Sequence, residues 1–267
     1  MTAGFAIRRM LLALDLSPAA RSMLPEALRL ANRLNAEAEG LFVEDSRMVN
    51  VLAGEGLPAR HVSTVTGLSE TLDARAMDAA LRAQSALLAR HVSATAAALR
   101  CHCELRTVRG IVAETLVSQA DQDDLLVLSR RPGHVGATLA ATIRRMSAPV
   151  LVLPPGESVG QGRIVVVADS AGFLARGLAA ARWFKGDSDR VVEVLSGAAV
   201  TPAEAESQLR SFDLPARITA AVQTADLIQQ IRSDAGLVIV SPQNGALAGP
   251  NLAAFLASAH MPVLLMR

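Results

Sequence analysis

The chain of 267 residues is 51% hydrophobic and 19% charged, and its mean hydropathy of +0.33 excludes an intrinsically disordered protein. Its 26 Lys and Arg residues nearly balance 25 Asp and Glu residues, which excludes the basic excess of a nucleic-acid-binding protein. Aromatic residues make up only 3%, so the stacking platforms of single-strand binders are missing too. No apolar run reaches the about 18 residues of a membrane helix, and we expect neither nucleic acid nor a membrane as partner.

Short apolar runs alternate with longer Ala-rich stretches from the N-terminus onward, a pattern typical of alternating strands and helices. The runs lack strict polar alternation, as expected for parallel strands that helices cover on both faces. The first helix is predicted to begin at Ser17 and Pro18, a capping hydroxyl followed by proline, and to end near Asn35. Strands are predicted over 10–14, 40–43, 105–108, 125–128 and 150–153, and further helices over 74–99, 111–120 and 137–146.

The segment 154–162 is rich in Pro, Gly and polar residues, and the same pattern starts again after it. The run Ile164–Asp169 repeats Met10–Asp15, and Pro262–Met266 repeats Pro149–Leu153. Gly136 stands thirteen residues before Pro149, and Gly249 stands thirteen residues before Pro262. We therefore predict two domains, 1–157 and 158–267, the first with an inserted segment at about 46–75 that the second lacks.

A strand ending in Asp15, the sequence Phe42–Asp45, the sequence Val108–Gly110 and the terminal Pro149–Leu153 together resemble the universal stress protein family. The resemblance covers nearly the whole chain, twice, so the chain is similar to a tandem member. It implies an α/β fold of two three-layer α/β/α domains, each with a five-stranded parallel sheet in the order 3-2-1-4-5. It also implies an intramolecular pseudo-dimer in which residues 150–153 and 263–266 meet.

The resemblance implies a crevice between the first and fourth strands that holds ATP or another adenine nucleotide, with no metal beyond its Mg²⁺. Asp15 and the backbone at Val43 would contact the adenine. A glycine-rich loop would wrap the phosphates, because glycines let backbone N–H groups approach them closely. The remaining predicted binding residues belong to this loop and its flanks: Ser129, Arg130, Arg131, Gly133, Gly136 and Ala137.

This loop departs from the family's pattern of Gly-x2-Gly-x9-Gly-Ser/Thr. Met146 stands where the third glycine is expected after Gly133 and Gly136. Aligned on Pro149 instead, Gly136 takes the last glycine position, and Ala137 replaces its hydroxyl partner. In the second repeat, Pro250 occupies the corresponding place and donates no N–H. A pocket is therefore implied more strongly than its occupant.

Several residues have a second interpretation. Asp15 is placed to accept backbone N–H groups at a strand-to-helix turn, and Arg130 and Arg131 can simply lie in water. Cys101 and Cys103 flank His102 in what reads as one strand, where the thiols would share a face opposite the imidazole. No second cysteine pair completes a zinc site, so we interpret them as buried, inert thiols of a reducing cytoplasm.

No set of Ser, His and acidic residues stands at a recognisable catalytic motif, so no catalytic residue is predicted. The preferred function is a non-enzymatic stress-response or regulatory protein, acting through protein partners that the sequence does not identify and assembling as a homodimer of tandem chains. One alternative is a nucleotide-dependent hydrolase or transferase with Arg130, Arg131 and His134 at the phosphates, which leaves weak ATPase activity open. Another is a structural interaction module without nucleotide.

Overall fold

The structure is a computed structural model, and the residues that it describes are 5–47, 60–62, 69–71, 74–131, 133, 135–196, 200–212, 214–220, 231, 234–245, 247 and 249–267. Side chains are not described for residues 60–62, 69–71, 74–76 and 220. The inserted segment predicted at about 46–75 falls mostly outside the described residues. Within it lies one short antiparallel pair, β3 (Arg60–Val62) with β4 (Ser69–Thr71).

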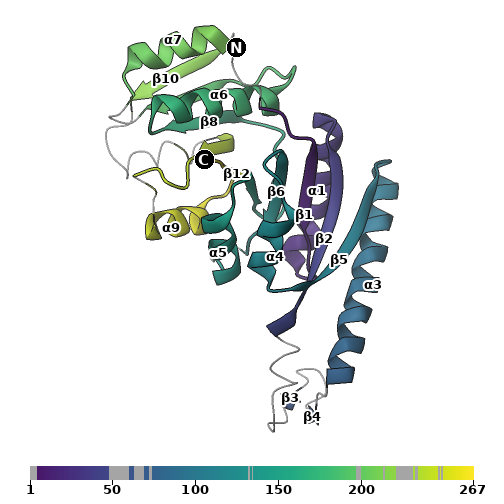
Figure 1. Cartoon of the computed structure of the whole chain (residues 1–267). Helices are drawn as coiled ribbons and strands as arrows, with labels where there is room; N and C mark the ends of the chain where they lie inside the picture. The colour runs from purple at the N-terminus through teal and green to yellow at the C-terminus, as the bar shows by residue number, and fades with distance from the viewer. Residues whose placement is uncertain are drawn as a thin grey trace.

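A single 10-stranded sheet runs through the molecule in the order β10-β9-β8-β11-β12-β7-β6-β1-β2-β5 (Figure 1). Within each half of the chain the strand order is 3-2-1-4-5, with every pair parallel, as the family resemblance implies. The first half contributes β1 (Arg9–Ala13), β2 (Glu37–Asp45), β5 (Cys103–Gly110), β6 (Asp124–Ser129) and β7 (Val150–Leu153). The second half contributes β8 (Arg163–Ala168), β9 (Val192–Ser196), β10 (Ala216–Ala220), β11 (Ala235–Val240) and β12 (Val263–Leu265).

The two halves join through β7 and β12, which pair antiparallel with Leu264 opposite Leu151 and Val263 opposite Val152. This pairing confirms the predicted meeting of the two terminal strands. It also covers an edge of each half-sheet, whose unpaired N–H and C=O groups would otherwise be open to another chain. The predicted boundary after residue 157 lies in the connection between β7 and β8.

Helices cover both faces of the sheet and give the expected three layers (Figure 1). One buried cluster lies beneath α1 (Pro18–Leu34), α3 (Ala74–Ala98), α6 (Ala171–Lys185) and α7 (Pro202–Phe212). The other lies beneath α4 (Val112–Gln119), α5 (Ala137–Arg145) and α9 (Pro250–Ser258). Both clusters draw residues from both halves, so the apolar core is continuous across the joining strands. No helix among the described residues is long and apolar enough to span a bilayer.

Local signals in the sequence fix several helix ends. The Ser17 hydroxyl accepts a 3.2 Å hydrogen bond from the N–H of Ala20, and Asn35 ends the same helix in the left-handed conformation. Gly136 and Gly249, the two glycines of equal spacing, are the N-cap residues of α5 and α9. One expectation is wrong: Cys101 lies before β5 rather than within it, so the alternation of a strand does not relate its thiol to that of Cys103.

Candidate functional site

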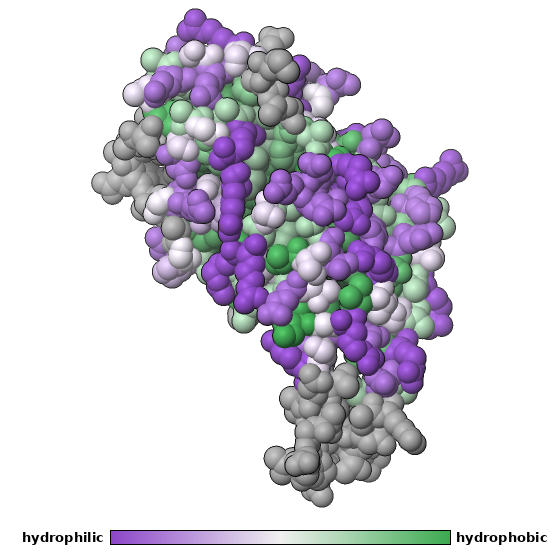
Figure 2. Space-filling model, viewed as in Figure 1, coloured by the Kyte–Doolittle hydropathy of each residue, from purple (hydrophilic) through white to green (hydrophobic). Residues whose placement is uncertain are grey.

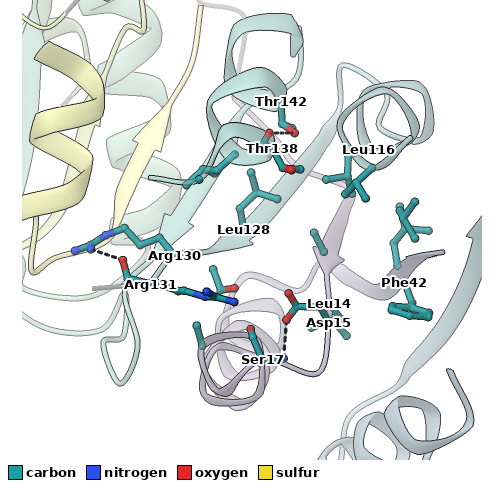
Figure 3. Close-up of a pocket in the computed structure, with 18 residues that line it drawn as sticks. Leu14, Asp15, Ser17, Phe42, Leu116, Leu128, Arg130, Arg131, Thr138 and Thr142 are labelled. Atoms are coloured by element: carbon teal, nitrogen blue, oxygen red, sulfur yellow. Dashed lines mark hydrogen bonds between the residues drawn. The ribbon is translucent and has the colours of Figure 1, made fainter. Parts of the chain in front are cut away.

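A pocket of about 400 Å³ opens at the carboxyl ends of β1 and β6, where the connections of the first half diverge to opposite sides of its sheet (Figure 3). Such a switch point is where open α/β sheets leave a crevice for ligands. Of the predicted residues, the structure brings six to the lining of this pocket, which we call the β1/β6 pocket: Asp15, Val43, Ser129, Arg130, Arg131 and Gly136. Gly133 and Ala137 are exposed and are not among the lining residues.

One side of the β1/β6 pocket is apolar, formed by Phe42, Val112 and Leu116 among others. The β1–β2 ladder ends with Ala13 opposite Leu41, and the N–H of Leu14 donates to the carbonyl of Leu41 at 2.9 Å. Backbone direction alternates along a strand, so Val43 points its N–H and C=O to the same side as Leu41. Because β1 has ended there, these two groups face the pocket beside apolar walls.

Asp15 lies at the mouth of the pocket, with an exposed side chain. Its Oδ1 accepts a 2.9 Å hydrogen bond from the N–H of Ser17, drawn as a dashed line in Figure 3. The capping interpretation of this carboxylate is therefore correct, and the residue lines the pocket as well. A substitution that removes the acceptor would change the start of α1 together with any ligand contact.

Arg130 and Arg131 follow β6 and point in opposite directions (Figure 3). Arg131 reaches over the pocket toward Asp15, whereas Arg130 turns away and is only 5% exposed. The Arg130 Nη1 donates to the carbonyl oxygens of Ala257, at 3.1 Å, and Arg131, at 3.3 Å. Burial lowers the pKa of the Arg130 guanidinium. Of the two arginines, Arg131 is the one placed to meet a ligand anion.

The helix α5 begins at the pocket and brings hydroxyl groups that the motif comparison missed. Thr138 and Thr142 line the pocket, and the Thr142 hydroxyl donates to the carbonyl of Thr138 at 2.8 Å. Thr138 is exposed, in the first turn of α5, beside the N-cap Gly136. The family's pattern places a hydroxyl at position 137, and here the hydroxyl belongs to the next residue, Thr138. Because Gly136 is the N-cap of α5, residue 138 falls in the first helical turn, and this position could have identified Thr138 from the sequence.

One side of the pocket thus brings together the guanidinium of Arg131, the hydroxyl of Thr138 and the amino end of α5. The opposite side is apolar and includes the backbone groups of Val43. Free N–H groups and the helix dipole make a helix amino end attractive to phosphate, and guanidinium adds a fixed positive charge. These residues fit an adenine nucleotide in outline. The described residues of this loop do not reproduce the family's glycine cradle, since Gly133, with φ +70°, has open space around it and lies outside the lining.

The other candidate groups contribute no reactive centre that the structure describes. His134, assigned to the phosphates in the enzymatic alternative, lies outside the described residues. Both cysteines are free, and burial raises the pKa of the Cys103 thiol to about 11, which disfavours the reactive thiolate. Within the part of the chain that is described, no three His, Cys, Asp or Glu residues gather in a way that could hold a metal ion.

The corresponding region of the second half is built differently. Asp169 accepts a hydrogen bond from the hydroxyl of Ser170, and Ser170 caps α6 by accepting from the N–H of Phe173 at 3.2 Å. The Ser241 hydroxyl accepts from the N–H of Gln243 at 3.1 Å, and α9 begins with Pro250. An Asp and a capping Ser thus stand at both strand-to-helix turns, whereas the first turn of α9 has no hydroxyl like that of Thr138, and its first residue, Pro250, donates no N–H.

The fold and the position of the β1/β6 pocket define a tandem, doubly wound α/β protein. The solved structures that this chain resembles include a universal stress protein from Archaeoglobus fulgidus, with a TM-score of 0.70 and 13% identity over 99% of this chain and 97% of that one. They also include a protein of unknown function from Pseudomonas aeruginosa, with a TM-score of 0.60 and 15% identity over 100% of this chain and 94% of that one. The chain therefore has the universal stress protein fold, and the predicted resemblance is confirmed for the fold. Neither a scan of family models nor a search of curated proteins finds a match.

Proposed function

We propose that the protein is a non-enzymatic stress-response or regulatory protein of the universal stress protein type, and that its β1/β6 pocket binds an adenine nucleotide. The observation that carries the proposal is the division of this pocket into two sides. Val43 offers a backbone donor and acceptor beside apolar walls, which suits the edge and faces of a purine. Arg131, Thr138 and the start of α5 suit the phosphates.

A titration of the full chain with ATP, ADP, AMP and adenosine tests the proposal, with Arg131→Gln as the informative variant. A hydrogen bond to a charged group is worth about 1.5–3 kcal/mol, so we expect this variant to bind ATP about 10- to 150-fold more weakly. Adenosine, which has no phosphate, should bind the variant and the wild type equally. Arg210→Gln is the matched control, because Arg210 is exposed on α7 and is not among the residues that line this pocket.

Two outcomes contradict the proposal. Absence of saturable binding at millimolar nucleotide would favour the structural interaction module. Steady ATP turnover above buffer, abolished in Arg131→Gln, would favour the nucleotide-dependent enzyme. A cytoplasmic location, Mg²⁺ bound with the nucleotide, and a homodimer of tandem chains stay predictions, the last testable by light scattering of the purified protein.

A further inference from the structure

A second pocket of about 400 Å³ lies between α5 of the first half and α9 of the second, and we call it the interhelix pocket. Residues of both halves form it, so only the joined chain has this site. Its lining includes Ala140, Ile143 and Arg144 of α5, Leu252 and Leu256 of α9, and Arg267. The helix α5 turns a different face to the β1/β6 pocket, which receives Thr138, Leu139 and Thr142.

The walls of the interhelix pocket are apolar and fixed in place. Ile143, Leu252 and Leu256 are buried members of the core cluster beneath α5 and α9. Ala140 and Ala253 project only methyl groups, and their small size leaves space between the two helices. Figure 2 shows hydrophobic surface beside a column of hydrophilic side chains in this region. A ligand that fills the space would gain from burying apolar groups.

The polar part of the lining is cationic. Arg144 is exposed, and Nη2 of Arg267 donates to the carbonyl oxygen of Arg144 at 2.6 Å, which holds the Arg267 guanidinium at the end of α5. Gln243 adds an uncharged amide, and none of the lining side chains is acidic. Two guanidinium groups beside an apolar cavity without an acidic side chain favour an anionic group attached to an apolar one.

We propose that the interhelix pocket binds a small amphipathic carboxylate, of the fatty-acid class, with its tail between α5 and α9 and its carboxylate at Arg144 and Arg267. Guanidinium matches a carboxylate with two parallel hydrogen bonds, and the apolar walls offer the tail a continuous surface. A pocket of this volume lies in the range of small-molecule sites. The proposal is independent of nucleotide binding, because the two pockets share no lining residue.

Calorimetric titration of the full chain with hexanoate, octanoate and decanoate, below their micelle concentrations, tests this site. We expect one saturable site per chain and an increase in affinity of about fourfold per methylene. Decanol, with the same tail and no charge, should bind at least tenfold more weakly than decanoate. Equal binding of decanol, or binding that never saturates, would overturn the proposal and indicate nonspecific adsorption.

Substitutions locate the site. Arg144→Gln should weaken decanoate binding at least tenfold, while Arg145→Gln, its neighbour, should leave affinity within twofold. Arg145 is the matched control because it pairs with Glu114 at 3.1 Å and does not line the pocket. Ala253→Phe and, from the facing helix, Ala140→Phe should each fill the cavity and abolish binding, with folding checked by circular dichroism. Retained affinity in Arg144→Gln, or in a folded filling variant, would refute the site.

Discussion

The buried guanidinium of Arg130 donates a 3.1 Å hydrogen bond to the carbonyl oxygen of Ala257, in the last turn of a helix of the opposite half. Its counterpart is the 2.6 Å bond from Arg267 to the carbonyl of Arg144. Ala257 and Arg144 are equivalent positions, since each precedes the proline of its terminal strand by five residues (262 − 257 and 149 − 144). Each half thus supplies an arginine that donates a hydrogen bond to a carbonyl group in the last turn of the other half's helix. The two arginines come from different places in the repeat.

We expect Arg130→Met to lower the free energy of unfolding by about 1–3 kcal/mol, because the carbonyl groups of Ala257 and Arg131 lose a charged donor. Part of that loss is offset, because the variant no longer has the free-energy cost of burying a guanidinium charge. Arg267→Gln should cost less than about 1 kcal/mol, since its guanidinium is exposed to water. Urea unfolding measures both, with Arg131→Met as the exposed neighbouring control. Equal effects of the Arg130 and Arg131 variants would show that the contact to α9 contributes nothing.

The joining strands give a second prediction. Leu151 and Leu264 are fully buried, lie opposite each other in the β7–β12 pairing and belong to the same core cluster. Either substitution by Ala should lower stability by about 2–5 kcal/mol. The loss of stability in the double variant should differ from the sum of the two single losses by about 0.5–3 kcal/mol, because the two side chains are neighbours. Leu87→Ala is the control, since Leu87 is 50% exposed. Strict additivity would argue against the pairing of these strands.

The fold could be predicted because its signals are local. Ser17, Pro18 and Asn35 determine where α1 begins and ends through groups within a turn of each other, and Gly136 and Gly249 mark equivalent helix starts. The strands read as apolar runs because both faces of the sheet are covered. The predicted strands are shorter than the observed ones where polar residues continue the ladder, as in β2, which extends from Glu37 to Asp45.

The site could be predicted only in part, because side-chain direction depends on the other half of the chain. Nothing within the local sequence says that Arg130 turns toward α9 while Arg131 turns toward the pocket. Thr138 was missed because the motif places the hydroxyl directly after the glycine, whereas this shorter loop brings the next helical residue to the pocket. The interhelix pocket required knowing that α5 and α9 lie near one another across the joined strands.

The ion pair of Asp124 with Arg9 predicts an acid-dependent loss of stability. Burial alone would raise the pKa of Asp124, but hydrogen bonds from Arg9 and from the N–H of Asp121 outweigh it and hold the pKa below its usual 3.8. A carboxylate with a lowered folded-state pKa stabilises the fold above its unfolded value of about 3.9, and this contribution is lost as pH falls through the folded value.

Asp124→Asn should therefore cost about 1–3 kcal/mol at pH 7, because Arg9 loses its buried carboxylate partner but keeps its ion pair with Glu39 at 2.7 Å. Between pH 5 and pH 2 the variant should lose less stability than the wild type, since it has no carboxylate to protonate at this site. Denaturant unfolding across this range measures both effects, and Asp123→Asn, at an exposed neighbour, is the control. Parallel stability curves for wild type and variant would contradict the assignment.

The two thiols should differ in reactivity because their surroundings differ. Cys103 is 7% exposed, and burial raises its pKa to about 11, so at pH 8 about one thiol in a thousand is ionised. Burial raises the pKa of Cys101 too, but this thiol is partly exposed. With iodoacetamide at pH 8, mass spectrometry should show Cys101 modified first and Cys103 protected, while both react alike in denaturant. Modification of Cys103 at the rate of Cys101 in the folded protein would show that its thiol is accessible, and would contradict the interpretation of Cys103 as a buried, inert thiol.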